Sequence, residues 1–401
     1  MLKIAYIHQY FGTTKGSWST RPYEFGKRWS QAGYQVTIIT APYYKSDVVS
    51  SRFIDRQYMD RMEVIIINAP DSNLFSKLKR IWNALRFAFS CTWLVIRCRY
   101  DVVIASSGPI TVGIPGIAAK LLRKSKLIFE VRDLWPEGGV QMGLFKGRFR
   151  NKLAYWFESF CYKQSDAIIA LSQGMEEYIK MKNSKLYVTV IPNSSDTDLF
   201  QNKVYAAPDF PQHLLGKRLF VYFGSLGLMD ACEEILYGFQ LLKHRTDLGC
   251  VFIGDGAYRK DLEGIAKEIG LSDHVHFTGL IPKSDVVGWL KEAVGSFVVF
   301  KPFPVLSTSS PNKLFDSFAS GLPVIQNTKG WMSELIDRTG CGINVVSGDS
   351  VSMSNAILKL ADDPEFWSKA SSSSLQLGSI EFNRSFLSDK YIGVINSISH
   401  V

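Results

Sequence analysis

Short apolar runs rich in β-branched residues recur along the chain and alternate with longer stretches of helical periodicity. This alternation predicts an α/β protein with parallel sheets that are covered by helices on both faces. The strands predicted in the first half are 3–7, 35–40, 62–68, 101–105, 126–131, 166–171 and 186–192. Those predicted in the second half are 219–223, 250–254, 274–278, 296–300, 323–326 and 342–346.

A proline-marked break at 206–211 separates the two series of strands. We therefore predict two doubly wound, Rossmann-like domains, 1–205 and 206–380, that face each other across a cleft. The last segment, 381–401, is expected to form a helix that returns to the first domain. Ligands of doubly wound folds bind beyond the carboxyl ends of the strands, so the cleft is the expected site.

The composition is that of a globular protein, with 401 residues, 46% hydrophobic and 21% charged. The six cysteines are scattered and form no C-x-x-C pair, and Lys3 is followed at once by a predicted strand rather than by a signal peptide. We therefore expect a reduced, cytoplasmic protein.

The net charge of +9 is unevenly distributed. Residues 1–200 hold 28 Lys and Arg against 16 Asp and Glu, whereas the remainder holds 18 against 21. A basic half can be solvated surface, or it can bind nucleic acid or an anionic membrane. Zinc-finger spacing, a basic leucine zipper and an aromatic RNA-binding signature are all missing from the sequence, so we predict no nucleic-acid partner.

The segment 76–99 favours a membrane. Its longest unbroken run of apolar and small residues, 87–96, is half of the roughly 20 residues that a membrane-spanning helix needs. We expect this segment to lie on an anionic membrane surface, although a core helix with basic edges has the same pattern. The basic residues of the segment are Lys77, Lys79, Arg80, Arg86, Arg97 and Arg99, and the large apolar ones include Trp82, Phe87, Phe89, Trp93 and Leu94.

The most informative segment is 298–325, VVFKPFPVLSTSSPNKLFDSFASGLPVI, which predicts a strand, a polar loop, a helix and a second strand. Pro311 suits the first turn of a helix, and Ser309 or Ser310 is expected to cap that turn. The N–H groups of Asn312, Lys313 and Leu314 would then point at one spot. An anion is favoured there by the helix dipole.

Two charged side chains of the same helix fit a nucleotide. The Lys313 ammonium would lie near the bound phosphate, and Asp316 would accept hydrogen bonds from sugar hydroxyls, as acidic residues do in dinucleotide folds. An ordinary surface helix with a good N-cap remains the alternative for this segment alone.

Other predicted strand ends carry ligand-binding residue types. After the first strand, Gly12 and Gly16 allow close backbone approach and Arg21 can bind a phosphate, although a flexible loop is equally consistent. Arg132 and Asp133 follow the strand 126–131, where Asp133 can also be a simple turn cap.

Glycines mark two strand ends in the second half. Gly224 and Gly227 follow one strand, and Gly254 belongs to the IGDG run of 253–256. Both runs allow a phosphate to approach the backbone, and both can also be simple turns.

Taken in order, these segments resemble the retaining glycosyltransferases of family 4, which have the two-domain GT-B fold. The similarity is carried by GYQVTIIT, DVVIASSGP, IFEVRDLWPE, VIPNSSDTDLF, FIGDGAYRKDLE, VHFTGLIPKSDV and SPNKLFDSFASGLPVI, together with Arg21 and Glu24 in the first loop. RDLWPE and PNKLFD are most similar to the branch that builds bacterial surface polysaccharides, including fucosamine transferases of O-antigen and capsule assembly.

The sequence departs from the family at two places. Many members have two glutamates eight positions apart, where this chain has Thr308 and Asp316. Members also tend to have an arginine and a lysine after the first strand of the second domain, where this chain has Ser225 and Asp230. The positive charge for a diphosphate is therefore expected from Arg21, Arg132, Lys301 and Lys313, and from the amides after Pro311.

The resemblance implies that a sugar leaves a nucleoside diphosphate with retention of its anomeric configuration, with UDP favoured over GDP and without a cofactor or metal. The D-x-D sequence 196–198 is interpreted as part of the linker rather than as a metal site. The expected catalytic residues are Asp133, Lys313, Arg132 and Arg21. The expected donor-binding residues are Gly224, Ser225, Gly227, Gly254, Lys301, Thr308, Ser309, Ser310, Pro311, Asn312, Leu314 and Asp316, and the acceptor-binding ones are Gly12, Gly16 and Glu137.

The expected acceptor is a polyprenyl-diphosphate-linked glycan at the inner face of a bacterial plasma membrane. Two alternatives stay open: a nucleotide-sugar epimerase of the same fold, and a non-catalytic scaffold of a polysaccharide assembly complex. An epimerase needs acid and base carboxylates that we cannot place, and a scaffold need not bind a nucleotide.

Overall fold

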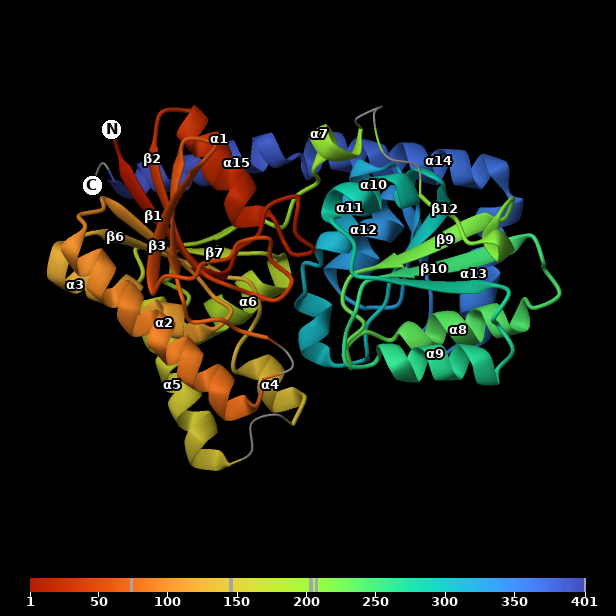
Figure 1. Cartoon of the computed structure of the whole chain (residues 1–401), viewed down its shortest axis with the longest axis horizontal. Helices are drawn as coiled ribbons and strands as arrows, with labels where there is room; N and C mark the ends of the chain where they lie inside the picture. The colour runs from red at the N-terminus through yellow and green to blue at the C-terminus, as the bar shows by residue number, and fades with distance from the viewer. Residues whose placement is uncertain (73–74, 144–146, 202–204, 206–207, 400–401) are drawn as a thin grey trace. The chain divides into compact units, whose positions relative to one another are not determined.

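The computed structural model describes residues 1–72, 75–143, 147–201, 205 and 208–399, and it divides the chain into two units (Figure 1). Unit 1 consists of Met1–Pro192 together with Ser385–Val401, and unit 2 is Asn193–Arg384. The C-terminal segment thus belongs to the same unit as the N-terminal half of the chain.

Unit 1 is built on an eight-stranded sheet with the order β3-β4-β2-β1-β5-β6-β7-β8. All neighbouring strands are parallel except β3 and β4, which pair antiparallel at one edge. The strands are β1 (Lys3–Tyr10), β2 (Gln35–Ala41), β3 (Ile54–Met59), β4 (Met62–Ile67), β5 (Val102–Ser106), β6 (Lys126–Val131), β7 (Ala167–Ala170) and β8 (Val188–Val190). Most positions of the parallel strands are buried, which is why these strands appear in the sequence as nearly continuous apolar runs.

The helices of unit 1 cover both faces of this sheet. They are α1 (Arg21–Gln31), α2 (Lys77–Arg97), α3 (Gly113–Arg123), α4 (Glu137–Gln141), α5 (Arg148–Gln164), α6 (Gln173–Lys182) and α15 (Arg384–Ser399). On one face, Phe25 and Trp29 of α1 and Tyr391 of α15 pack with alternate residues of the strands, such as Ile4 and Tyr6.

The opposite face of the sheet is covered by α2, α3 and α5. Gly116 of α3 lies against Leu127 and Ala105, and Tyr162 of α5 contacts the ring of Phe129 with centroids 5.9 Å apart. Helix α3 contacts both α2 and α5, so the three helices form one layer.

Unit 2 has a six-stranded, wholly parallel sheet with the order β11-β10-β9-β12-β13-β14. Its strands are β9 (Arg218–Phe223), β10 (Leu248–Ile253), β11 (Val275–Gly279), β12 (Ala293–Val298), β13 (Val324–Gln326) and β14 (Gly342–Asn344). Its helices are α7 (Thr197–Phe200), α8 (Cys232–Leu241), α9 (Arg259–Glu268), α10 (Lys283–Lys291), α11 (Asn312–Ala319), α12 (Trp331–Thr339), α13 (Ser350–Asp362) and α14 (Pro364–Gln376).

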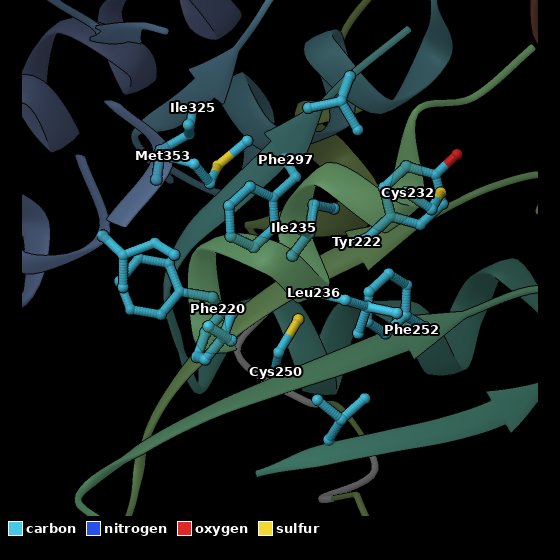
Figure 2. Close-up of a cluster of buried hydrophobic side chains, with 14 of the residues drawn as sticks. Phe220, Tyr222, Cys232, Ile235, Leu236, Cys250, Phe252, Phe297, Ile325 and Met353 are labelled. Carbon is cyan, nitrogen blue, oxygen red and sulfur yellow. The ribbon is translucent and has the colours of Figure 1, made fainter. Parts of the chain in front are cut away.

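A large core cluster of unit 2 lies between the sheet and the helices α8, α9 and α13. Figure 2 shows Phe220 and Tyr222 of β9, Phe252 of β10 and Phe297 of β12 among the side chains that fill it. Alternate strand residues therefore fix which face of each strand points to these helices. Because all neighbouring strands of this sheet are parallel, their carboxyl ends lie at a common edge.

Every predicted strand overlaps a strand of the structure, but the antiparallel strand β3 was not predicted. Its hairpin turns at Asp60 and Arg61, which have positive φ angles of 48° and 65°. Turns of this kind are usually marked in a sequence by Asn-Gly or Asp-Gly, and this one is not.

The chain leaves unit 1 after Pro192, which is earlier than the predicted boundary after residue 205. Asn193 already bonds to unit 2, because its backbone and side-chain N–H groups donate to Ser310 at 3.2 and 2.6 Å. The predicted break at 206–211 begins at two residues, 206 and 207, that lie outside the described part of the chain.

The return to unit 1 occurs at Ser385, close to the predicted start of the last segment at 381. Among the described residues, none of the helices is long and apolar enough to cross a membrane.

Candidate active site

The carboxyl edge of the unit 2 sheet carries two loops that touch each other. One follows β9 and the other follows β10, and a Cβ atom added to Gly254 would lie 1.8 Å from the carbonyl oxygen of Gly224. Gly254 also has a φ of 138°, a backbone conformation that residues other than glycine rarely adopt. The predicted glycines therefore serve close packing of two loops.

Lys313 is the residue around which this edge is organised. It lies in the first turn of α11, yet it is only 8% exposed. Its Nζ donates to the hydroxyl of Tyr222 at 2.5 Å and to Oδ1 of Asp230 at 3.0 Å, and it lies 4.0 Å from the centre of the Tyr222 ring. A Cβ at Gly224 would lie 3.2 Å from Lys313 Cε, so the glycine makes room for the lysine.

Asp230 is the counter-ion of Lys313, which explains an acidic residue in a loop where the resemblance leads one to expect a base. Its second oxygen accepts from the N–H of Gly227 at 3.3 Å. Burial, and then the Asp230 charge, raise the pKa of Tyr222, so its hydroxyl stays neutral and donates to the carbonyl of Ser225 at 2.6 Å.

The start of α11 differs from the prediction. Pro311 is the N-cap residue, and neither Ser309 nor Ser310 caps the helix. The Ser310 hydroxyl instead accepts from the N–H of Asn193, and the Ser309 carbonyl accepts from Trp331 Nε1 at 2.9 Å.

The N–H group of Leu314 is also not free, because it donates to the Pro311 carbonyl at 3.1 Å. The N–H groups of Asn312 and Lys313 are the first two of the helix, where no intrahelical carbonyl can reach them. Of the three N–H groups that were predicted to bind an anion, those of Asn312 and Lys313 therefore remain candidates. Thr308 ends the turn before the helix, and its hydroxyl donates to the carbonyl of Val305 at 2.8 Å.

Asp316, the expected ribose ligand, is 6% exposed and paired with Lys283. Lys283 Nζ donates to both carboxylate oxygens at 3.0 Å. Burial raises the pKa of the Asp316 carboxyl, while the charges of Lys283 and Arg384 oppose that rise. Lys283 was not predicted, although its place just after β11 puts it at the ligand-binding edge of the sheet.

Lys301 is likewise paired. Its ammonium forms an ion pair with Glu233, and its N–H donates to the carbonyl of Met229 at 2.9 Å. The segment that carries Lys301 therefore runs along the loop after β9.

The D-x-D sequence of the linker forms structure within unit 2. Asp196 caps α7 and pairs with Arg384, whose NH1 lies 2.6 Å from its Oδ2. Among the residues that the structure describes, no group of three or more His, Cys, Asp or Glu side chains could hold a metal ion.

In unit 1, the structure corrects the role predicted for Arg21. Its side chain is 2% exposed and bonds to Glu130 and to the carbonyls of Ile191 and Pro192. A phosphate in solution cannot reach this guanidinium, so Arg21 holds the end of unit 1 together rather than binding a ligand.

Glu130 is buried beneath the strand ends between Arg21 and Arg132. Burial alone would raise its pKa, but the two guanidinium groups and hydrogen bonds from Ser106 and Tyr6 outweigh burial and lower the pKa to about 2. The carboxylate accepts from the Tyr6 hydroxyl at 2.8 Å and from Ser106 Oγ at 2.7 Å.

Arg132 and Asp133 lie at the end of β6. Arg132 is partly exposed and contacts Ser19 Oγ at 3.0 Å and His8 Nε2 at 3.4 Å, whereas the Asp133 side chain is exposed. Burial, and then the Arg132 charge, lower the pKa of His8 to about 3, so the imidazole is neutral and its Nε2 accepts from Arg132. His8 and Glu130 were missed by the sequence analysis because both lie within strands, in β1 and β6, among apolar neighbours.

The three predicted acceptor residues have partners inside unit 1. Gly16 packs on Asp47, since a Cβ there would lie 2.9 Å from Oδ1 of Asp47, and Gly12 lies near the same side chain. Glu137 accepts from Tyr155 and Gln141 at 2.7 and 2.8 Å. These contacts give each residue a partner within unit 1, and its assignment to the acceptor stays a prediction.

The fold and the strand-end sites define a class of protein. Residues 18–194 match the family model of the glycosyl transferase 4-like domain, and residues 217–363 match that of glycosyl transferases group 1. The chain therefore belongs to the glycosyltransferases, with the two parallel-sheet domains of the GT-B fold.

Among named proteins, the probable glycosyltransferase WbjE of Pseudomonas aeruginosa is 26% identical over 289 residues, which cover 69% of this chain and 70% of WbjE. The lipopolysaccharide core biosynthesis glycosyltransferase LpsD of Rhizobium meliloti (strain 1021) is 27% identical over 175 residues, 43% of this chain and 46% of LpsD.

Solved structures agree on the fold. Sucrose-phosphate synthase from Thermosynechococcus elongatus has a TM-score of 0.79 at 15% identity, with 99% of both chains covered. HepE from Anabaena, in complex with UDP and glucose, has a TM-score of 0.70 at 15% identity, with 99% of this chain and 100% of HepE covered. At such identities the similarity establishes the fold and not the substrates.

Proposed function

We propose that this glycosyltransferase moves a sugar from a nucleoside-diphosphate donor to a polyprenyl-diphosphate-linked glycan, with retained configuration. The observation that carries the proposal is the buried Lys313 ammonium in the first turn of α11, beside the glycine loop after β9. An ammonium has three N–H donors, and Tyr222 and Asp230 take two of them. The third donor is available to a diphosphate oxygen.

The leaving group explains why such a lysine matters. When the bond from the anomeric carbon to the diphosphate breaks, negative charge grows on the departing phosphate oxygen. A fixed ammonium and the first amides of α11 stabilise that charge more in the transition state than in the ground state. The site thus performs the task of a metal ion with Lys313 and the N–H groups of Asn312 and Lys313.

The proton of the acceptor hydroxyl has a destination in this scheme. The departing phosphate takes it as the new glycosidic bond forms on the face that the phosphate leaves. We assign the exposed Asp133 to orienting a sugar and Arg132 to supporting Asp133, since both directly follow β6.

UDP is favoured over GDP because HepE, which has the same fold, is described in complexes with UDP and with UDP-glucose. The name of LpsD, a lipopolysaccharide core biosynthesis glycosyltransferase, supports a role in bacterial surface polysaccharide, such as O-antigen, capsule or exopolysaccharide. A hexosyl or N-acetylhexosaminyl group, with fucosamine among the candidates, is the sugar we propose.

A lipid-linked acceptor would place the enzyme at the inner face of the plasma membrane as a peripheral protein. The outward aromatic side chains of α2 support contact of 76–99 with an anionic surface, because Trp82 and Trp93 are 68% and 51% exposed.

The test uses the full chain with radiolabelled UDP- and GDP-sugars and lipid-linked acceptors, without added metal. Label that moves into the lipid fraction only when acceptor is present supports the proposal. Donor that is isomerised without acceptor would identify an epimerase. Calorimetry with UDP and GDP completes the test, because a protein that binds neither and transfers nothing would be a scaffold.

A further inference from the structure

Three neighbouring helices of unit 1, and not α2 alone, carry large apolar side chains on their outer sides. On α2 these are Leu78, Ile81, Trp82, Phe89 and Trp93, on α3 Leu121 and Leu122, and on α5 Phe149, Leu153 and Trp156. All of them are at least half exposed, and Phe149 reaches 80%. Outward apolar residues in this number are unusual for a solvated helix layer.

The apolar residues follow helical stripes. On α2 the steps from Leu78 to Trp82, Phe89 and Trp93 are four, seven and four, so these side chains lie on one side of the helix. The opposite side holds Phe87 and the other buried residues that pack toward the sheet. The outward stripe is therefore separate from the core-facing stripe.

Helix α5 repeats this arrangement. Phe149, Leu153 and Trp156 are spaced by four and three, and the Trp156 ring stacks on Phe160 with centroids 5.5 Å apart. Because α2, α3 and α5 form one layer on the same face of the sheet, their outer sides belong to a single surface (Figure 1).

The charges on this layer have one sign. Helix α2 contains five Lys and Arg, α3 two and α5 four, while α2 and α3 contain no acidic residue. The single acidic residue of the three helices is Glu158 of α5, which is 0% exposed and paired with Lys182. Two of the basic residues have acidic partners outside these helices, since Arg80 pairs with Asp71 and Lys120 with Asp166. The outer surface of the layer therefore combines aromatic rings with an excess of positive charge.

We infer that α2, α3 and α5 together form a docking face for an anionic lipid bilayer. The aromatic and leucine side chains enter the boundary between headgroups and acyl chains, and the lysines and arginines contact anionic headgroups. Charge complementarity selects this occupant. The three helices carry eleven basic residues, of which Arg80 and Lys120 pair with acids elsewhere, and no exposed acidic residue of their own. A protein partner or a second copy of the chain would not require such an excess of one charge.

The inference deepens the proposed function, since it names the surface that brings the enzyme to a lipid-linked acceptor, but it is tested without turnover. Vesicles of phosphatidylcholine alone and of phosphatidylcholine with phosphatidylglycerol are floated with the full chain. We expect the protein to rise with the anionic vesicles, and less of it to rise as NaCl is increased.

Variants on two helices test whether the whole three-helix face binds the membrane or only the segment 76–99 does. Lys152→Glu on α5 and Arg86→Glu on α2 should each lower partitioning onto anionic vesicles on the order of tenfold. Trp156→Ala should lower the partitioning about fivefold or more. This loss should persist at high salt, because the variant removes apolar area that the bilayer would bury.

Two controls match these changes. Lys260→Glu reverses an exposed lysine on α9 of unit 2, and Phe386→Ala removes a ring on α15, which covers the opposite face of the unit 1 sheet. Neither should change flotation. If only the α2 variant has an effect, or if Lys260→Glu is as damaging as Lys152→Glu, the three-helix face is refuted.

The remaining outcomes are equally decisive. A folded protein that does not float with either vesicle refutes the face, and so does a Trp156→Ala variant that dissociates a dimer in sedimentation without altering flotation. If the protein does not float but transfers sugar to a water-soluble acceptor analogue, the docking face is refuted and the proposed function stands. If it floats but transfers nothing, the docking face stands and the proposed function is refuted.

Discussion

The buried charges near the strand ends occur in pairs, and each partner decides what the other can do. Arg21 bonds to Glu130 and two carbonyls and is inaccessible, whereas the Lys313 ammonium keeps one donor beyond Tyr222 and Asp230. Breaking a buried pair from one side leaves a charge without compensation, which costs about 3 to 5 kcal/mol. The two residues therefore have different consequences when they are mutated.

Lys313→Met tests the diphosphate contact. The methionine fills the space beside Gly224 but cannot donate, so we expect UDP binding to weaken by about 1.5 to 3 kcal/mol, the scale of a hydrogen bond to a charged group. Isothermal calorimetry measures the change. Lys260→Met on α9 is the matched control and should bind UDP like the parent protein. Equal affinity in Lys313→Met would remove this lysine from the donor site.

Asp230→Asn tests the role of the counter-ion. The amide oxygen still accepts from Lys313, while the negative charge 3.0 Å from the ammonium is lost. We expect UDP affinity to hold or to rise, because the attraction between Lys313 and a diphosphate is no longer opposed. Weaker binding of UDP at unchanged thermal stability would mean that Asp230 itself contacts the ligand or holds Lys313 only through its charge.

His8 gives a pH dependence with a defined sign. Its pKa is about 3 in the folded protein and about 6.5 in an unfolded chain, so between these values the unfolded state binds the additional proton. Stability due to His8 is therefore complete above pH about 6.5 and falls by about 1.4 kcal/mol per pH unit toward pH 3. Chemical denaturation of His8→Gln, which cannot be protonated, should show a correspondingly smaller loss between pH 6.5 and 5, and parallel curves would contradict the assignment.

Among the elements, the loops after β9 and β10 show how the sheet edge is built. The loop after β10 donates to and accepts from the loop after β9, through the bonds from Leu226 N–H to the Asp255 carbonyl and from Tyr258 N–H to the Leu226 carbonyl. Two loops held this closely form a rigid floor under the Lys313 side chain. Their glycines are thus required by packing, whether or not a ligand touches them.

Gly254→Ala tests this floor. The new methyl would collide with the Gly224 carbonyl at a φ where alanine is strained, so we expect a loss of several kcal/mol in stability and a large loss of UDP binding. Gly264→Ala is the control within the same unit, because its Cβ meets nothing within 4 Å and it lies inside α9. That change should stabilise the protein by about 0.5 to 1 kcal/mol. Thermal unfolding and calorimetry measure both, and similar behaviour of the two variants would contradict the packing argument.

At the scale of the whole molecule, the sequence predicted local patterns well and long-range partners poorly. The strands follow from apolar runs, and the two sheets follow from the alternation of strands and helices. The partners of the site residues do not, because Arg21 meets Glu130 and Lys313 meets Asp230 from distant positions in the chain. A charged residue after a strand looks the same in the sequence whether it is paired inside the protein or directed at a ligand.

The last helix shows how the distant ends of the chain cooperate, and it carries the final prediction. Tyr391 of α15 is 0% exposed and packs on Phe25 and Trp29 of α1, with ring centroids 5.8 and 5.0 Å away. Tyr391→Ala should therefore destabilise unit 1 by about 3 to 5 kcal/mol, the cost of removing a buried aromatic side chain. Because Tyr391 belongs to the core of unit 1 alone, hydrogen exchange should accelerate in β1, β2 and β5 and stay unchanged in β9 and β10. Exchange that accelerates first in unit 2 would show that α15 stabilises the other unit, contrary to the core in which it lies.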